Sequence, residues 1–143
     1  MPDFESRAVR ALVLLLDVHF RRCVATWHDA KAADVTLPPS AEPHYHSLDA
    51  LLAHILAAAR EELVWICRQL ELTEPEVSRE SSVDQILAAW KSALVTVSDE
   101  APYEPEITSG WGLTYSISSM LEHVVMHAIR HEFQLAELLS QKA

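Results

Sequence analysis

The sequence predicts an all-α fold, a four-helix bundle, and three observations support this. Four segments carry apolar residues at intervals of three or four positions, the spacing at which residues share one face of a helix. Only two glycines occur, while alanine, leucine and glutamate, which favour helix, are abundant. No run of β-branched residues alternates with period two. A chain of 143 residues fits one domain, residues 1–143, with a single buried core.

The first helix is expected over residues 4–27 and the second over residues 47–70. The apolar stripe of the first consists of Val9, Leu12, Leu16, Phe20 and Cys23. The stripe of the second, which follows Ser47 as a plausible N-cap, consists of Leu48, Leu52, Ile55, Ala59, Leu63, Ile66 and Leu70. Three prolines in the segment VTLPPSAEPHYH predict a long loop between these two helices.

The third helix is expected over residues 82–98 and the fourth over residues 113–139. Their apolar stripes consist of Val83, Leu87, Trp90, Leu94 and Val97, and of Ile117, Leu121, Val124, Ala128, His131, Leu135 and Leu138. The segment SDEAPYEPEITSGWG, with two prolines and both glycines, predicts a second long loop before the fourth helix. Four amphipathic helices in a short chain pack economically as a bundle, and the long first and third connections permit crossovers.

The composition of the chain excludes some classes of function and indicates a cellular compartment. A net charge of -10 repels phosphate backbones, which excludes nucleic-acid binding and disfavours anionic membranes. The longest uncharged apolar run, ALVLLL, is far too short to span a bilayer, and MPDFESRAVR lacks the basic start of a signal peptide. Cys23 and Cys67 are isolated on expected helices, as buried free thiols are in reducing compartments. We therefore expect a cytoplasmic protein.

The segment LEHVVMHAIRHEFQL carries His123, His127 and His131, each four residues after the last. On a helix, successive members of this series are about one turn apart and rotated by about 40°. His131 therefore lies in the apolar stripe, His127 lies at its border and His123 lies towards the rim. Two imidazoles on consecutive turns can converge on one metal ion.

The second helix offers a third imidazole for such a site. His54 lies at the edge of the apolar stripe in LLAHILAAA, where small alanines leave room beside the ring. A second helix that faces the fourth places His54 opposite His127 and His131. Three buried neutral imidazoles each need a partner for a ring nitrogen, and one shared cation meets that need. The alternative is that each histidine packs in the core with its own hydrogen bond, and a pH switch is a further reading.

The remaining titratable residues give weaker signals. His19 lies near the core edge of the first helix, where packing or a surface position is expected ahead of an approach to the metal. His44 and His46, in the proline-rich loop, are expected to be solvated. Exposed positions are also expected for the three acidic residues that lie on the metal-bearing helices, Glu61, Glu62 and Glu122. No residue is assigned as a catalytic acid or base.

The segments SLDALLAHILAAAREELVWI, GWGLTYSISSM and LEHVVMHAIRHEFQL resemble the DinB/YfiT family of small metal-binding four-helix proteins over nearly the whole chain. The resemblance implies a DinB/YfiT-type bundle with one divalent ion held by His54, His127 and His131. It also matches Gln134 to a glutamine often found three residues after the last ligand. The basic residue and the glycine that often follow that ligand in the family are absent, since the chain reads His131, Glu132, Phe133.

The resemblance implies a metal-dependent enzyme, with low-molecular-weight-thiol-dependent S-transfer as one activity of the family. A metal-dependent hydrolase and a non-catalytic metal-binding bundle are the alternatives. Zinc and nickel both suit imidazole ligands, and protons are expected to compete with the metal as the pH falls through about 6.5. Relatives often pair, so a homodimer is expected, with contacts from Trp65, Trp90 and Trp111 unless these side chains fill the core.

Overall fold

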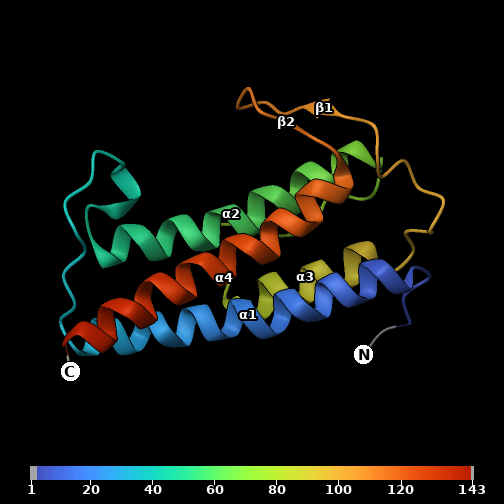
Figure 1. The fold of residues 1–143 in the computed structure, drawn as a ribbon. Coiled ribbons are helices and arrows are strands. Elements are labelled where there is room, and N and C mark those ends of the chain that lie inside the picture. Colours follow the sequence, from blue (N-terminus) through green and yellow to red (C-terminus); the bar gives the residue numbers. More distant parts are fainter. Residues whose placement is uncertain (1–2, 143) are drawn as a thin grey trace.

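Four helices lie side by side in the computed structural model, which describes residues 3–142 (Figure 1). They are α1 (Arg7–Ala32), α2 (Leu48–Gln69), α3 (Val83–Leu94) and α4 (Ile117–Lys142). A single 3₁₀ turn, η1 (Pro43–Tyr45), and two short strands, β1 (Ile107–Thr108) and β2 (Thr114–Tyr115), lie in the connections. The four-helix, mainly helical fold is therefore confirmed. Within the described range, no helix is both long and apolar enough to cross a membrane.

Both ends of α1 differ from the sequence-based expectation of residues 4–27. The helix begins at Arg7 because Ser6 caps it, with the Ser6 hydroxyl oxygen accepting from the Val9 amide at 3.2 Å. It continues to Ala32, since residues 28–32 contain no proline or glycine to stop it. The chain then turns at Asp34, which has a φ of 54°.

The connection between α3 and α4 is more ordered than the expected loop. β1 and β2 pair antiparallel, with Ile107 opposite Tyr115, and Gly112 takes a φ of 85° in the turn between them. Because Thr114 and Tyr115 belong to this hairpin, α4 begins at Ile117 rather than at residue 113. α3 ends at Leu94 rather than at residue 98, and the β-branched segment Val95–Val97 follows it.

The helices do not simply alternate in direction. α1 packs chiefly along α4, and the two are parallel, since Lys142 Nζ at the end of α4 donates to the carbonyl of Asp34 just after α1. α2 runs antiparallel to α4 and contacts it, whereas α3 contacts α1 and α2 and runs in the direction of α2 (Figure 1). Because α2 and α3 run in the same direction, the chain must run back along the length of the bundle between them, in residues 70–82. Neither of the two longer connections does this.

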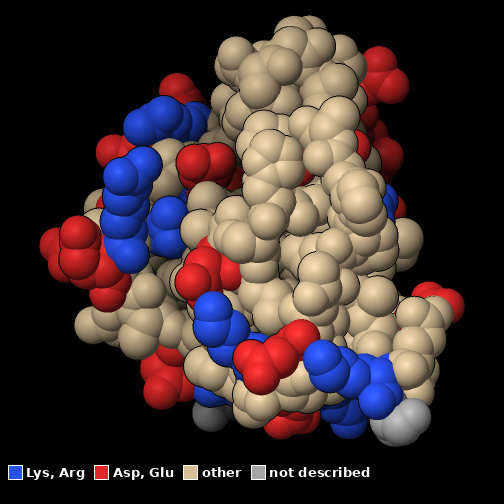
Figure 2. All heavy atoms as spheres, turned by 90° about the vertical axis from the view of Figure 1, so that its left-hand side faces the viewer, with Lys and Arg blue, Asp and Glu red and all other residues tan. Residues whose placement is uncertain are grey.

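The core lies between the four helices. Trp90 is 1% exposed, and its indole N–H donates to the carbonyl of Ala59 at 3.1 Å. Trp65 is also buried, and only Trp111 of the three tryptophans considered for a dimer contact is exposed. Two of these three indoles therefore fill the monomer. At the end of the bundle that carries residues 33–47, Lys and Arg side chains lie beside acidic ones, around a broad uncharged surface (Figure 2).

Candidate metal centre

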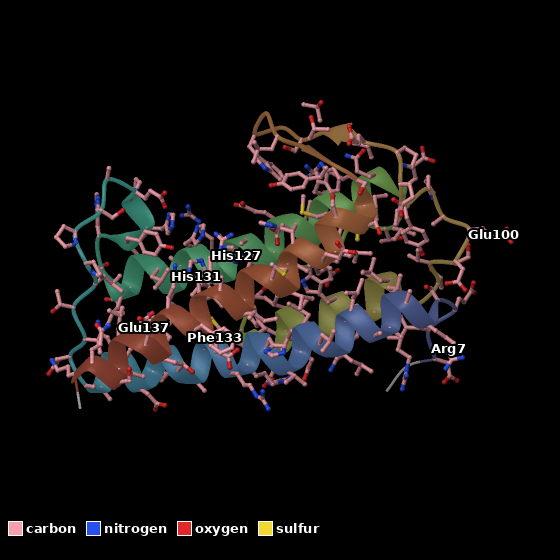
Figure 3. All side chains as sticks on the ribbon, viewed as in Figure 1. Arg7, Glu100, His127, His131, Phe133 and Glu137 are labelled. Carbon is pink, nitrogen blue, oxygen red and sulfur yellow. The ribbon has the colours of Figure 1, made fainter. Side chains whose placement is uncertain are left out.

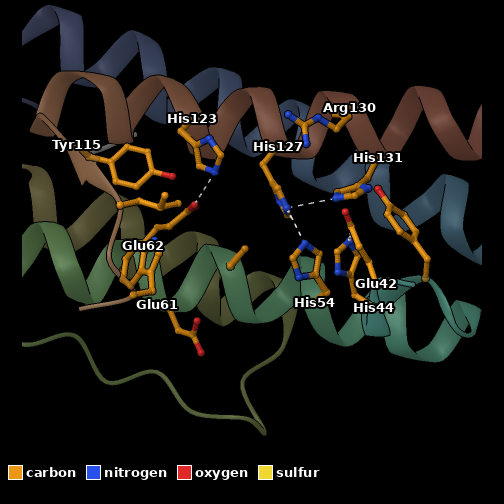
Figure 4. Close-up of a pocket in the computed structure, with 14 residues that line it drawn as sticks. Glu42, His44, His54, Glu61, Glu62, Tyr115, His123, His127, Arg130 and His131 are labelled. Carbon is orange, nitrogen blue, oxygen red and sulfur yellow. Dashed lines mark hydrogen bonds and ion pairs between the residues drawn. The ribbon is translucent and has the colours of Figure 1, made fainter. Parts of the chain in front are cut away.

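The antiparallel contact between α2 and α4 brings three histidines together. His127 and His131 point from α4 towards α2 (Figure 3). The Nε2 atom of His127 lies 2.9 Å from Nε2 of His54 and 3.2 Å from Nε2 of His131 (Figure 4). One ring nitrogen from each of the three histidines lies within 4.8 Å of the other two. The residues expected from the sequence as a ligand set thus occupy one site.

The protons of the three imidazoles cannot give every ring nitrogen in this cluster a hydrogen-bond partner. Nδ1 of His131 lies 2.7 Å from Oε1 of Gln134, and because an amide oxygen only accepts, the proton of a neutral His131 is on Nδ1. Nε2 of His131 then carries a lone pair that faces Nε2 of His127. The single proton that Nε2 of His127 can carry serves one of its two neighbours. A cation among the three nitrogens satisfies all the lone pairs, so the donor set fits a metal ion.

Gln134 fixes the orientation of one candidate ligand, His131, and is itself held by a hydrogen bond. Its Nε2 donates to the hydroxyl of Tyr45 at 3.1 Å, so a chain of hydrogen bonds runs from Tyr45 in η1 through Gln134 to His131 in α4. Partners of this kind hold ligating imidazoles in the correct tautomer and orientation. The sequence resemblance pointed to Gln134, whereas nothing in the sequence indicated Tyr45.

The pKa values of the three imidazoles are lowered. Burial, followed by the neighbouring histidines, lowers the pKa of His127 to about 3, and burial lowers that of His131 to about 4. The pKa of His54 is lowered by burial and then by His44. The rings are therefore neutral at neutral pH, as ligation requires. In the folded protein, protons compete with a metal for His127 and His131 only well below pH 6.5, which corrects the expectation from unperturbed histidine.

His44 does not lie in solvent as the sequence suggested. The turn η1 places its ring parallel to that of His54, with centroids 4.0 Å apart, and its Nε2 lies 3.2 Å from Oε2 of Glu42. In Figure 4 the His44 ring lies beside that of His54 and below His131, so it covers one flank of the cluster. A histidine in a proline-rich loop gives no periodic signal, so only the three-dimensional structure shows this contact.

Glu62 is buried, contrary to the expectation of an exposed acid. It is 6% exposed, and its Oε1 lies 3.1 Å from Nε2 of His123 across the interface between α2 and α4. Burial raises the pKa of the Glu62 carboxyl, and the hydrogen bond that His123 donates to Glu62 raises the pKa of His123. Within residues 3–142, Oε2 of Glu62 has no hydrogen-bond partner. His123 is therefore paired with Glu62 rather than placed among the candidate ligands.

His19 and the two cysteines lie away from the cluster. Nδ1 of His19 lies 3.2 Å from Oε2 of Glu132, which links α1 to α4. Cys23 and Cys67 are buried and unpaired, as expected, and burial raises the pKa of their thiols to about 12 and about 11. These thiols are poor nucleophiles.

A pocket of about 380 Å³ opens onto the cluster between α2, α4, η1 and the hairpin. His54, His127 and His131 line it together with the Glu62–His123 pair. Trp111, Leu113 and Tyr115 come from the hairpin and form its apolar wall. The cluster is thus accessible to a small molecule through an amphipathic pocket.

Comparisons with protein-family models, with curated proteins and with solved structures found no match to this chain.

Proposed function

We propose that the protein binds one divalent metal ion through His54, His127 and His131 and acts through it on a small molecule. The observation that carries the proposal is the convergence of three Nε2 atoms that cannot all be satisfied by their own protons. Three neutral imidazoles suit zinc or nickel, and because they carry no charge they do not neutralise the double positive charge of the ion. Such an ion lowers the pKa of a thiol or a water molecule that binds to it.

A low-molecular-weight thiol is the proposed cosubstrate, and the proposed reaction joins its sulfur to an electrophilic carbon, with release of the thiol proton and of the leaving group of the electrophile. The resemblance to the DinB/YfiT family supports this assignment, and so does a pocket with both apolar and polar walls. The chain contributes three things to such a reaction. Gln134 and His44 hold two of the imidazoles, the hairpin encloses the pocket, and Glu62 with His123 supplies a polar pair beside the cluster.

Metal binding is tested by titrating purified metal-free protein with Zn²⁺ and Ni²⁺ in a calorimeter. Replacement of His54, His127 or His131 by alanine removes a ligand, so the affinity should fall by orders of magnitude. His123→Ala and His19→Ala are matched controls, because each removes an imidazole whose partner is a glutamate outside the cluster. Retention of full affinity in the three cluster variants would show that the ligand set is wrong.

The reaction is tested separately with metal-loaded protein, a thiol and a chloro-dinitrobenzene electrophile. Thioether formation should be faster than with metal-free protein and should be lost in His127→Ala. Hydrolysis of ester substrates without any need for thiol would instead favour the hydrolase alternative. Tight metal binding with neither activity would leave a metal-binding bundle without turnover.

A further inference from the structure

Arg130 is the only lysine or arginine among the described residues that line the pocket of the histidine cluster. It lies on α4 between His127 and His131, and it is exposed. Of the arginines in the part of the chain that the structure describes, only Arg21 and Arg68 form ion pairs. The guanidinium of Arg130 is therefore available to a molecule that enters the pocket.

The geometry of α4 places this arginine beside the cluster. Arg130 follows His127 by three residues, which corresponds to a rise of about 4.5 Å and a rotation of about 60° around the helix axis. Side chains on a helix lean towards its N-terminus, so Arg130 reaches back along α4 towards His127 (Figure 4). Burial is the main cause that lowers the pKa of His127 and His131, and the charge of Arg130 adds to it. Glu61 and Glu62 lie towards the other end of the pocket (Figure 4).

A positive side chain beside a cation site is unfavourable unless an anion accompanies the metal. Three neutral imidazoles leave a bound divalent ion with its double charge, and like charges at short range repel each other. Of the acids that line the pocket, Glu42 is paired with His44 at 3.2 Å. Glu62 is paired with His123 at 3.1 Å. A ligand with two negative groups, one on the ion and one on Arg130, offsets the repulsion that these acids do not remove.

We propose that Arg130 forms a subsite for a carboxylate group of the thiol, so that the preferred ligand is a small mercaptocarboxylate. This inference rests on the proposed function, which supplies the metal-bound sulfur. A guanidinium matches a carboxylate in shape and donates two parallel hydrogen bonds to it. The thiolate on the ion is the second negative group, because a divalent metal ion favours this form of a thiol. The contact with Arg130 selects an acidic thiol over a neutral thiol of the same length.

The test uses full-length protein loaded with Co²⁺, because a thiolate bound to Co²⁺ gives a charge-transfer absorption that reports binding directly. 3-Mercaptopropionate and its neutral amide, 3-mercaptopropionamide, are titrated at pH 7.5, and the ratio of their affinities is measured in each protein. The two thiols differ in acidity, so the change in this ratio between variants carries the result. Arg130→Gln should reduce the preference for the carboxylate about tenfold.

Arg60→Gln is the matched control, since it removes the same charge from α2 at a position outside the lining of this pocket and should leave the ratio unchanged. Without thiol, Arg130→Gln should bind Co²⁺ at least as tightly as the wild-type protein, because the substitution removes a positive charge beside the ion.

Three results would overturn the subsite while leaving the proposed function intact. They are an unchanged ratio in Arg130→Gln, an equal fall of the ratio in Arg60→Gln, and a loss of Co²⁺ affinity in Arg130→Gln. If the wild-type protein takes up no Co²⁺, or binds neither thiol, the proposed function is wrong and this inference fails with it.

Discussion

His127 lies between the other two histidines of the cluster. It is 9% exposed and its Nε2 faces the Nε2 atoms of two other histidines. Nonpolar surroundings oppose its protonation, and the positive charge of a protonated neighbour would oppose it further. A metal ion among these nitrogens would satisfy their lone pairs without any proton being added to a buried ring. The cluster therefore suits a metal ion under conditions in which the three imidazoles are neutral.

The stability of the metal-free protein is predicted to fall as the pH falls from 6.5 towards 4. In this window the unfolded chain protonates its histidines, while folded His127 and His131, with pKa values of about 3 and about 4, stay neutral. Each lowers the free energy of unfolding by up to about 1.4 kcal/mol per pH unit. Urea unfolding at pH 7.5, 6 and 5 measures this slope. His127→Leu should have a shallower slope, and an identical slope would contradict the assignment.

Gln134→Leu is predicted to weaken metal binding by about 10-fold to 100-fold, because it removes the acceptor that fixes the Nδ1 proton of His131. Calorimetric titration with Zn²⁺ measures the effect. Gln141→Leu, the same substitution at an exposed position on α4, is the control and should retain the wild-type affinity. Equal affinities in the two variants would mean that His131 needs no such support.

At the residue scale, the sequence was sufficient to predict the site residues whose positions follow helical periodicity. His54, His127 and His131 were predicted because their spacing and apolar neighbours place them on facing surfaces of two helices. Glu62 was expected in solvent because a charged residue beside Glu61 has no signal for burial, and its partner, His123, is 61 positions away. The contact between His44 and His54 depends on the path of a loop, which no period encodes.

At the scale of the element, α3 depends most on its ends because it is the shortest helix, Val83–Leu94. Ser82 and Gln85 form a reciprocal capping box, in which the Ser82 hydroxyl oxygen accepts from the Gln85 amide at 3.1 Å. Ser82→Ala is predicted to lower the free energy of unfolding by about 1 kcal/mol, measured by urea denaturation. Ser92→Ala, at an exposed interior position of the same helix, should not destabilise the protein.

The observed helix and strand boundaries show which boundaries can be predicted from nearby residues in the sequence. The cap Ser47 was recognisable in the sequence, and α2 begins directly after it, as α3 begins directly after Ser82. The hairpin was missed because each of its strands has only two residues, too short for an alternating pattern. Its pairing instead depends on the turn at Gly112 and on the packing of Tyr115 beside Trp65 and His123.

At the scale of the whole molecule, the homodimer stays a prediction. The most exposed large apolar side chains are Phe133, at 66%, and Met126, at 63%, both on α4, which packs along α1. Multi-angle light scattering at micromolar concentration should give the mass of a dimer. If this surface forms the contact, Phe133→Glu should give a monomer, whereas Leu113→Glu, at an exposed position on the hairpin, should not. A monomeric mass for the wild-type protein would refute the dimer.

The number of helices and their inward faces followed from the sequence, but their order in space did not. Each apolar stripe specifies that a helix has a buried side, without specifying which neighbour covers it. The parallel pairing of α1 with α4 is a long-range choice, and the sequence between α2 and α3 gives no sign that it returns along the bundle.

The pairing of α1 with α4 also sets the timing of folding during biosynthesis. The ribosome makes α1 first, yet the main partner of α1 is the last helix of the bundle. The apolar side of α1 therefore lacks its main packing partner until the next three helices have been translated, and chaperones can bind it during this period. Two of the three clustered histidines lie on α4, so the nascent chain cannot assemble the three-histidine cluster before this late docking step.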